Sequence, residues 1–258
     1  MVDEVSVANN RSPNASLVRP GRSAGQFDAY ASRNRVTTHS LLLKAPWIGN
    51  LSEELRRRVI AETVVRIIPH GGYVCRKGRP ADHWIGVLSG LVKVSSVSPR
   101  GKSVAFIGVP SGGWFGEGSL LKEELRRYDA TALRPSTIAY VPRSTFMLLL
   151  NSSVPFNRFI LIQLNERLGQ FVAMVEHDRL LNPEARLATE LAAMFNPRLY
   201  PDMGPTIPIS QEELGQLVGL SRQRVNQALN RLARAGLLKV AYGRLTVLDL
   251  QGLRELET

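Results

Sequence analysis

The residues best suited to contacting a partner directly lie between Ser221 and Arg231. Arginine, glutamine and asparagine fill the outward positions of this stretch: Arg222, Gln223, Arg224, Asn226, Gln227, Asn230 and Arg231. These side chains can form paired hydrogen bonds with the edges of guanine or adenine. From Ser221 to Arg244 there are six basic residues and no acidic one. The pattern predicts a surface that binds the major groove of DNA, and a solvated charged helix face is the simpler alternative.

A second group of residues has the chemistry to hold a small anion. Its members are Gly116, Glu117, Gly118, Ser119, Arg127 and Tyr128. A glycine-led turn at the start of a short helix exposes backbone N–H groups, which attract a phosphate. The Arg127 guanidinium could bind the same phosphate through two N–H groups, and the Glu117 carboxylate could accept a hydrogen bond from a ribose hydroxyl. The group therefore predicts a phosphate-binding turn, with a purely structural turn as the alternative.

Two short helices must position the first group of residues. Ser210 followed three positions later by Glu213 is the spacing of a helix capping box. Gly219 favours a tight turn after that helix, and Ser221 can cap the next one. Apolar residues at helical spacing predict the buried face of each helix: Leu214, Leu217, Val218, Val225, Leu229 and Leu232. Residues 209–235 are therefore predicted to form a helix-turn-helix.

Residues 64–142 alternate short β-rich runs with glycines. The glycines that mark the predicted corners are Gly71, Gly72, Gly78, Gly90, Gly101, Gly112 and Gly113. Strands this closely spaced, with no helices between them, predict a small barrel or roll. Just before this region, Ser52 is expected to cap a helix whose first turn carries Glu53 and Glu54, where the helix dipole favours acidic side chains.

Residues 154–181 have a helical period with a seam of apolar side chains. The seam residues Leu161, Leu164, Leu168, Phe171 and Val175 follow the alternating three- and four-residue spacing of a heptad repeat. Other apolar residues make the helix apolar on more than one side. We therefore expect one side to cover the roll while the seam meets a second copy in a parallel dimer, the alternative being a helix that packs only on its own roll. The 182–183 Asn-Pro pair is expected to end the helix.

A glycine-cornered roll, a long helix and a helix-turn-helix with a hairpin wing, in this order, resemble the Crp/Fnr family of bacterial transcription regulators. The resemblance covers residues 40–250, and the motif ISQEELGQLVGLSRQRVNQALNRL is specific to that family. It implies an α+β fold with a jelly-roll-like, cyclic-nucleotide-binding-like β-roll effector domain (39–153), a long dimerisation helix (154–182) and a C-terminal winged helix-turn-helix DNA-binding domain (183–258). Residues 1–38, polar and rich in Ser, Asn, Gly and Pro, are predicted to form a mobile N-terminal arm. It also implies a homodimer that binds palindromic double-stranded promoter DNA and contacts RNA polymerase.

The resemblance assigns roles to individual DNA-binding residues. By position, Arg222, Gln223 and Gln227 would contact base edges. The phosphate contacts would come from Ser210, Gln211 and Ser221. Arg222 matches an arginine that is frequent in the family, whereas Gln223 stands where many members have glutamate and Gln227 where some have arginine. The preferred DNA site is therefore expected to differ from the best-known one.

The anion-binding turn matches the family's cyclic-nucleotide pattern only in part. Three positions match: Gly116, Glu117 and Arg127. Tyr128 and Asp129 stand where cyclic-AMP binders have small residues, so the ring could fill the pocket and the carboxylate could repel a phosphate. Phe171 and Val172 align with the polar pair that binds adenine. Two alternatives therefore stay open: a cyclic nucleotide (cAMP or cGMP) or another small anion, against no ligand or an apolar one.

Composition limits which partners, metal sites and cellular locations the sequence predicts. Lysine and arginine exceed aspartate and glutamate by 33 to 22 in 258 residues, a net charge of +11 that favours a polyanionic partner. With Cys75 as its single cysteine, the chain has no internal disulfide and no cysteine-clustered zinc or iron–sulfur site, and neither haem nor another metal is expected. The sequence contains no apolar run long enough to span a membrane and no signal-peptide pattern, which predicts a cytoplasmic protein without a membrane partner.

Enzymatic activity is not expected. The sequence shows no nucleophile–base spacing, and the glycines of 112–118 lack the Lys-Ser/Thr of a P-loop. The competing function is a cyclic-nucleotide-binding module that regulates a protein partner without DNA. The basic helix predicted after Ser221 argues against that alternative.

Overall fold

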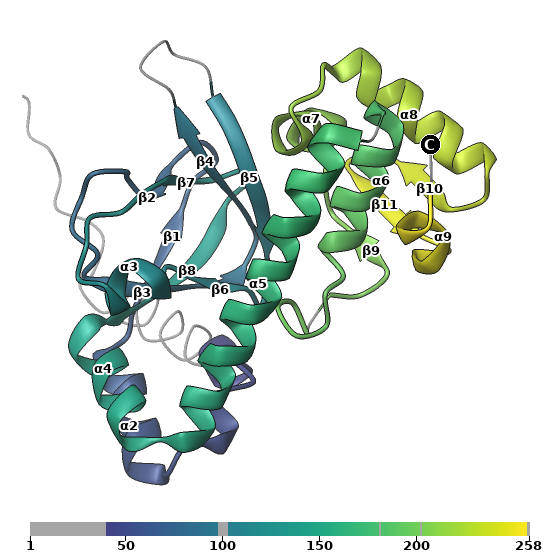
Figure 1. Cartoon of the computed structure of the whole chain (residues 1–258). Helices are drawn as coiled ribbons and strands as arrows, with labels where there is room; N and C mark the ends of the chain where they lie inside the picture. The colour runs from purple at the N-terminus through teal and green to yellow at the C-terminus, as the bar shows by residue number, and fades with distance from the viewer. Residues whose placement is uncertain (1–39, 98–102, 181, 202, 257–258) are drawn as a thin grey trace, which may run out of the picture. The chain divides into compact units, whose positions relative to one another are not determined.

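The computed structural model describes residues 40–97, 103–180, 182–201 and 203–256 (Figure 1). The expected arm at 1–38 and the corner at Gly101 lie outside these residues. The strands are β1 (Val64–Ile68), β2 (Tyr73–Cys75), β3 (His83–Ser89), β4 (Leu91–Val97), β5 (Ser103–Pro110), β6 (Trp114–Phe115), β7 (Asp129–Ala132), β8 (Ser136–Pro142), β9 (Thr206–Ile207), β10 (Leu238–Ala241) and β11 (Arg244–Val247). The helices are η1 (Ile48–Asn50), α2 (Glu53–Glu62), α3 (Glu117–Leu121), α4 (Arg143–Ser152), α5 (Val154–Leu180), α6 (Pro183–Ala193), α7 (Gln211–Val218), α8 (Arg222–Arg234) and α9 (Leu250–Arg254).

The first eight strands form the expected roll. They make two antiparallel four-stranded sheets, in the orders β1-β8-β3-β6 and β2-β7-β4-β5. Their inward faces share a core that includes Val87, Val92, Val109 and Ile138, all fully buried. The two-residue strand β6 was not predicted, because a pair of residues has too little pattern to reveal a strand.

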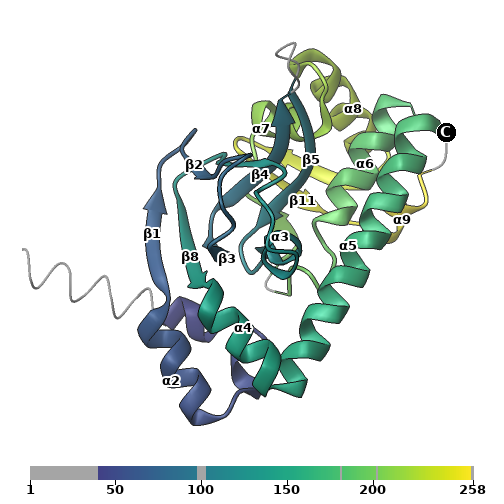
Figure 2. The ribbon, with the colours of Figure 1, turned by 60° about the vertical axis from the view of Figure 1, so that its left-hand side comes forward.

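An aromatic cluster closes the end of the roll where α2 and α4 pack beside the start of α5 (Figure 2). Trp47, Trp84, Trp114 and Phe156 are buried in it, and the rings of Trp84 and Trp114 lie 4.4 Å apart. Gly86 allows this contact, because a Cβ at that position would come within 2.6 Å of the Trp114 ring. The cluster anchors the first turns of α5 to the roll through ring–ring packing.

Helix α5 ends where the sequence predicts. Asn182 follows it and caps α6, accepting hydrogen bonds from the backbone N–H groups of Glu184 (3.0 Å) and Ala185 (2.9 Å). The cap and the proline after it fix the start of α6. Helix α4 was not anticipated, although its fully buried Phe146 and Leu149 have the spacing of a helix packed on a core.

The C-terminal part combines α6 to α9 with a three-stranded sheet in the order β10-β11-β9. This is the predicted winged helix-turn-helix, with β9 as an addition that the sequence analysis missed. Its core is built from α6, α7 and α8 and also takes in Leu91 and Leu133 of the roll. Arg134, next to Leu133, binds both carboxylate oxygens of Glu213 on α7 at 2.6 and 2.7 Å. Apolar packing and a bidentate ion pair thus join the roll to α7.

Candidate functional site

The cap residues of the helix-turn-helix lie as the sequence predicts. The Ser210 hydroxyl accepts a hydrogen bond from the Glu213 backbone N–H at 3.2 Å, and the Glu213 carboxylate accepts one from the Ser210 backbone N–H at 2.6 Å. Gly219 adopts a left-handed conformation with φ of 70° at the end of α7. Ser221 then caps α8 by accepting from the Arg224 backbone N–H at 3.4 Å. Capping and turn chemistry therefore fix the angle at which α8 leaves α7.

Helix α8 divides into a buried face and an exposed polar face. Val225, Leu229 and Leu232 are buried as predicted, together with Ala228. The predicted DNA-contacting residues on this helix are all exposed: Arg222, Gln223, Arg224, Asn226 and Gln227. Within the described ranges, the side chains of Arg222, Gln223 and Gln227 have no hydrogen-bond partner in the chain, so their donors and acceptors are available.

The remaining predicted DNA-binding residues flank this face. Ser221 is exposed at the start of α8, whereas Ser210 and Gln211 are half-buried at the start of α7. Three outward residues of α8 already have partners: Asn230 donates to Asn226 at 2.7 Å, and Arg231 pairs with Glu184 at 3.0 Å. The side chains that remain available for base contacts therefore lie mainly in the first two turns of the helix.

The wing adds exposed residues that the sequence analysis did not select. Tyr242 is fully exposed at the turn between β10 and β11, and Lys239 and Arg244 are exposed on the two strands. A hairpin with Gly243 at φ 66° presents them together. The Tyr-Gly pair between two short β-rich runs was the signal for this turn, but composition alone could not tell which strand residues face outward.

The six predicted anion-binding residues meet at one cavity of about 400 Å³ between the roll and α5. A volume of this size suits a small-molecule site. Glu117 and Ser119 are buried, and Gly116 has a φ of 95° at the start of α3. Because α3 has only five residues, its dipole contributes little to anion binding. Any charge selectivity of the cavity must therefore come from side chains.

Two adjacent arginines have different environments at this cavity. Arg127 lies at its rim with 73% of its side chain exposed, and its Nε is 3.3 Å from a carboxylate oxygen of Glu124. Arg126 is buried beneath the turn, where it donates to the carbonyl oxygens of Gly116 and His83. A Cβ at Gly116 would come within 2.3 Å of Arg126 Nη1. Arg126 therefore holds the turn in place, a role that its sequence position beside Arg127 does not reveal.

Arg167 of α5 is the cavity residue that the sequence analysis missed most completely. It is 7% exposed, donates to the Trp114 carbonyl oxygen, and places its Nε 3.7 Å from Glu117 Oε1. Burial alone would lower the pKa of Arg167, but nearby Tyr200, Glu117 and Tyr128 outweigh it and raise that pKa. Arg167 is therefore a permanent cation inside the protein.

The structure shows how Asp129 and Tyr128 lie relative to the cavity, which the sequence left open. Asp129 does not point into the cavity, because its carboxylate accepts a hydrogen bond from the Lys77 backbone N–H at 2.9 Å on the far side of β7. Tyr128 does line the cavity, and burial raises the pKa of its hydroxyl, so the ring is a neutral wall.

Two family descriptions match the chain. Residues 65–153 match a cyclic nucleotide-binding domain, and residues 185–256 match a Crp-like helix-turn-helix domain. The transcriptional regulator SdrP of Thermus thermophilus is 30% identical over 181 residues, which cover 69% of this chain and 85% of that protein. The chain belongs to the Crp/Fnr family. It is a transcription regulator with a helix-turn-helix DNA-binding domain.

Other Crp/Fnr relatives are similar at lower identity. The cAMP-activated global transcriptional regulator CRP of Pasteurella multocida is 28% identical over 183 residues, covering 69% of this chain and 87% of that one. The structure of FixK2 from Bradyrhizobium japonicum has the same fold, with a TM-score of 0.63 and 20% identity, over 76% of this chain and 98% of that chain.

A cyclic nucleotide fits only one end of this Crp/Fnr cavity. Gly118, Ser119 and Arg127 at the mouth could hold its phosphate, and Glu117 its ribose. The part next to α5 is walled by Leu164, Leu168 and Phe171. Among the described residues, Arg167 is the α5 side chain that brings polar atoms to this wall. The ribose and phosphate end therefore fits, whereas the α5 side offers a purine edge only this guanidinium and otherwise apolar side chains.

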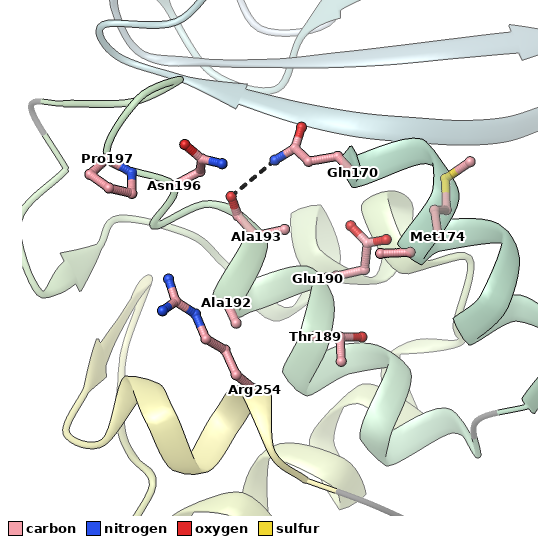
Figure 3. Close-up of a pocket in the computed structure, with 10 residues that line it drawn as sticks. Gln170, Met174, Thr189, Glu190, Ala192, Ala193, Asn196, Pro197 and Arg254 are labelled. Atoms are coloured by element: carbon pink, nitrogen blue, oxygen red, sulfur yellow. Dashed lines mark hydrogen bonds between the residues drawn. The ribbon is translucent and has the colours of Figure 1, made fainter. Parts of the chain in front are cut away.

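A second pocket, of about 250 Å³, lies where α5 and α6 meet α9 (Figure 3). Gln170 donates to the Ala193 carbonyl oxygen there at 3.3 Å, and Glu190 and Arg254 point toward the same space. Burial raises the pKa of the Glu190 carboxyl to about 7, against a smaller opposing effect of Arg186. This carboxyl titrates near neutrality at the junction between the long helix and the DNA-binding part.

Metal-binding groups and membrane-spanning helices are two further kinds of feature that side chains or helices could form. Among the described residues, no group of three or more histidine, cysteine, aspartate and glutamate side chains could hold a metal ion. Over the same residues, no single helix is long and apolar enough to cross a membrane, and only α4 and α5 taken together, across a bend of 111°, reach the required length and composition.

Proposed function

We propose that this protein is a homodimeric regulator that binds palindromic promoter sites through α8 and acts with RNA polymerase in the cytoplasm. The observation that carries the proposal is the exposed face of α8. It offers Arg222, Gln223 and Gln227, contains no carboxylate, and projects from a capped helix-turn-helix. This face matches the hydrogen-bonding groups and the negative charge of a DNA major groove.

The surface of α5 supports the homodimer. Four of the five predicted seam residues are exposed, with Leu161 at 66%, Leu168 at 63%, Phe171 at 39% and Val175 at 49%, and Val172 beside them is 61% exposed. They form one apolar stripe along a single helix. A stripe with heptad spacing is buried most simply against the same stripe of a second copy related by a two-fold axis. Leu164 is half-buried because it faces the cavity instead.

The effector domain would connect a ligand to this dimer. Leu168 and Phe171 contribute both to the cavity wall and to the exposed seam. A ligand in the cavity would therefore bias how the two α5 helices pack, and with them the spacing of the two α8 helices. Cyclic nucleotides are the ligands suggested by the matched domain and by the cAMP-activated relative.

Selection of binding sites from randomised duplex DNA, using the full-length protein, tests the proposal. Inverted repeats should be enriched, with half-sites about one helical turn apart. Binding should weaken steeply with salt, since a protein with net charge +11 displaces counterions from DNA. Enrichment of no sequence at any salt concentration would favour a regulatory module that acts on a protein partner without DNA.

A further inference from the structure

The buried guanidinium of Arg167 has hydrogen-bonding capacity that the protein does not use. Its Nη2 donates to Trp114, and the Tyr200 hydroxyl lies beside the guanidinium, but among the described residues its Nε and Nη1 make no hydrogen bond of normal geometry. The facing Glu117 is 4% exposed, and its Oε2 has no partner either. Buried polar groups without partners are costly. Both residues line the cavity, so a ligand there could satisfy them together.

The charges around the cavity favour a ligand with an anionic group. Five acidic or basic side chains line it: Glu117, Lys122, Glu124, Arg127 and Arg167. Three are basic and two acidic, which leaves one net positive charge. Lys122 and Arg127 at the rim already pair with Glu124, at 2.6 and 3.3 Å. The net positive charge therefore lies at the rim, where two cations share Glu124. Deeper in the cavity, Arg167 adds N–H donors that the facing Glu117 does not satisfy.

The positions of Arg167 and Glu117 restrict the ligand further. Arg167 Nε lies 3.7 Å from Glu117 Oε1, so a ligand that reaches both must carry its anionic group and a hydrogen-bond donor on neighbouring atoms. The remaining walls are apolar and aromatic, including Phe106, Phe115 and Phe171. These walls suit an aryl or branched alkyl group and provide nothing for the polar edge of a purine.

We propose that the cavity binds a carboxylic acid that carries a hydroxyl or amino group on the adjacent carbon and an apolar side chain. The carboxylate accepts hydrogen bonds from Arg167, the neighbouring donor binds Glu117, and the side chain packs against the phenylalanines. This proposal specifies the ligand class for the effector role proposed above. It concerns binding to the protein alone, so its failure would leave DNA recognition by α8 unaffected.

Calorimetric titration of the full-length protein without DNA tests the ligand class. The probes are 3-phenyllactate and phenylalanine, which distinguish the hydroxyl from the amino donor, and 2-hydroxyisocaproate and leucine as their branched alkyl counterparts. The comparison compounds are 3-phenylpropanoate, which lacks the donor, 3-phenyllactamide, which lacks the charge, and cyclic AMP and cyclic GMP. At least one probe should bind. Its affinity should be at least about tenfold higher than that of the compound lacking its donor or its charge, since bonds to charged groups are strong.

Two outcomes would overturn the proposal. One is that no probe gives heat at concentrations up to about 10 mM, and the other is that only a cyclic nucleotide binds.

Substitutions of Arg167 and Glu117 separate a ligand-binding role of this pair from a structural one. Arg167→Met should weaken the best probe at least about tenfold, whereas Arg158→Met, at an exposed arginine of the same helix, should leave it unchanged. Because Arg167→Met leaves Glu117 buried without its counter-charge, the double variant E117Q/R167M is also measured. If the double variant is as stable as the wild type and has lost probe binding, the pair serves the ligand. Undiminished probe binding by both variants would refute the assignment.

Discussion

At the residue scale, function depends on which side chains the fold leaves without partners. Arg222 and Gln223 keep their donors available on the surface of α8, while Arg231 on the same helix is engaged by Glu184. In the cavity the contrast is sharper, because Arg126 is satisfied by backbone carbonyls and Arg167 is not. Residue type alone therefore does not distinguish a structural arginine from one that can bind a ligand.

Replacing Arg222 with alanine tests base recognition directly. The arginine stands in the first turn of α8, where side chains face base edges and a guanidinium can bond guanine O6 and N7. Its loss should cost about 1–3 kcal/mol and remove the preference at one symmetric pair of positions in the selected sites. Arg234→Ala, at the end of the same helix, should change at most the slope of binding against salt. An unchanged preference in Arg222→Ala would mean that this residue does not contact bases.

At the element scale, two contacts decide how helices are held: the α5 seam, which we propose to lie between subunits, and the Arg134–Glu213 ion pair within the chain. The seam is apolar and exposed, which supports the proposed dimer. The ion pair is bidentate and partly buried, and Glu213 also caps α7, so one carboxylate fixes both the helix start and its contact with the roll.

Acidic substitutions on the seam should dissociate the dimer. In L161E/L168E, like charges would face their mates in the interface, at positions that are exposed within one subunit and therefore tolerate substitution there. Light scattering should show a monomer that binds a palindrome weakly. Arg79→Glu, at an exposed position of the roll between β2 and β3, is the control and should stay dimeric. A dimer that persists in the double variant would place the interface elsewhere.

A double-mutant cycle on Arg134 and Glu213 should show strong coupling. Charge-assisted bidentate bonds in a partly buried site are worth about 1–3 kcal/mol, and Glu213→Gln keeps a capping-box side chain while removing the charge. We expect chemical denaturation of R134L, E213Q and the double variant to give a coupling energy of at least about 1 kcal/mol. The exposed pair Arg57 and Glu53, 3.8 Å apart on α2, should give about 0.5 kcal/mol or less by the same method. Equal coupling in the two pairs would contradict a specific role for the roll–α7 contact.

At the scale of the whole molecule, buried carboxyl groups set how stability responds to pH. The pKa of Glu190 is raised to about 7 by burial, so the folded protein holds a proton that the unfolded chain has lost. The free energy of unfolding should therefore fall as pH rises from about 4.5 to about 7. Glu213 acts in the opposite sense: although burial alone would raise its pKa, hydrogen bonds from Arg134 and Ser210 lower it, and its contribution is lost as pH falls through that lowered pKa.

Glu190→Gln should therefore stabilise the protein at pH 8 and have little effect at pH 5. A rise of the Glu190 pKa from 4.5 to about 7 corresponds at most to about 3 kcal/mol, and solvent access reduces this to about 1–2 kcal/mol. Thermal unfolding of both proteins across this pH range measures the difference. A constant offset at every pH would mean that Glu190 is already ionised in the folded protein.

The local structure of this protein could be predicted from its sequence. Capping by Ser210 and Ser221, the turn at Gly219, the end of α5 before Asn182 and the roll of short strands all depend on neighbouring residues, which the sequence displays directly. The same is true of the polar face of α8, because helical spacing alone fixes which residues share that face.

Contacts between residues far apart in the sequence could be seen only in the folded protein. Sequence spacing could not show that Arg126 turns inward while Arg127 lies at the rim, since one step along the chain in an irregular turn reverses the direction of a side chain. Nor could it bring Arg167 to Glu117 across 50 positions of sequence, or Arg134 to Glu213 across 79. These pairs form because the packing of α5 and α7 on the roll sets which side chains meet, and that packing is a property of the whole core.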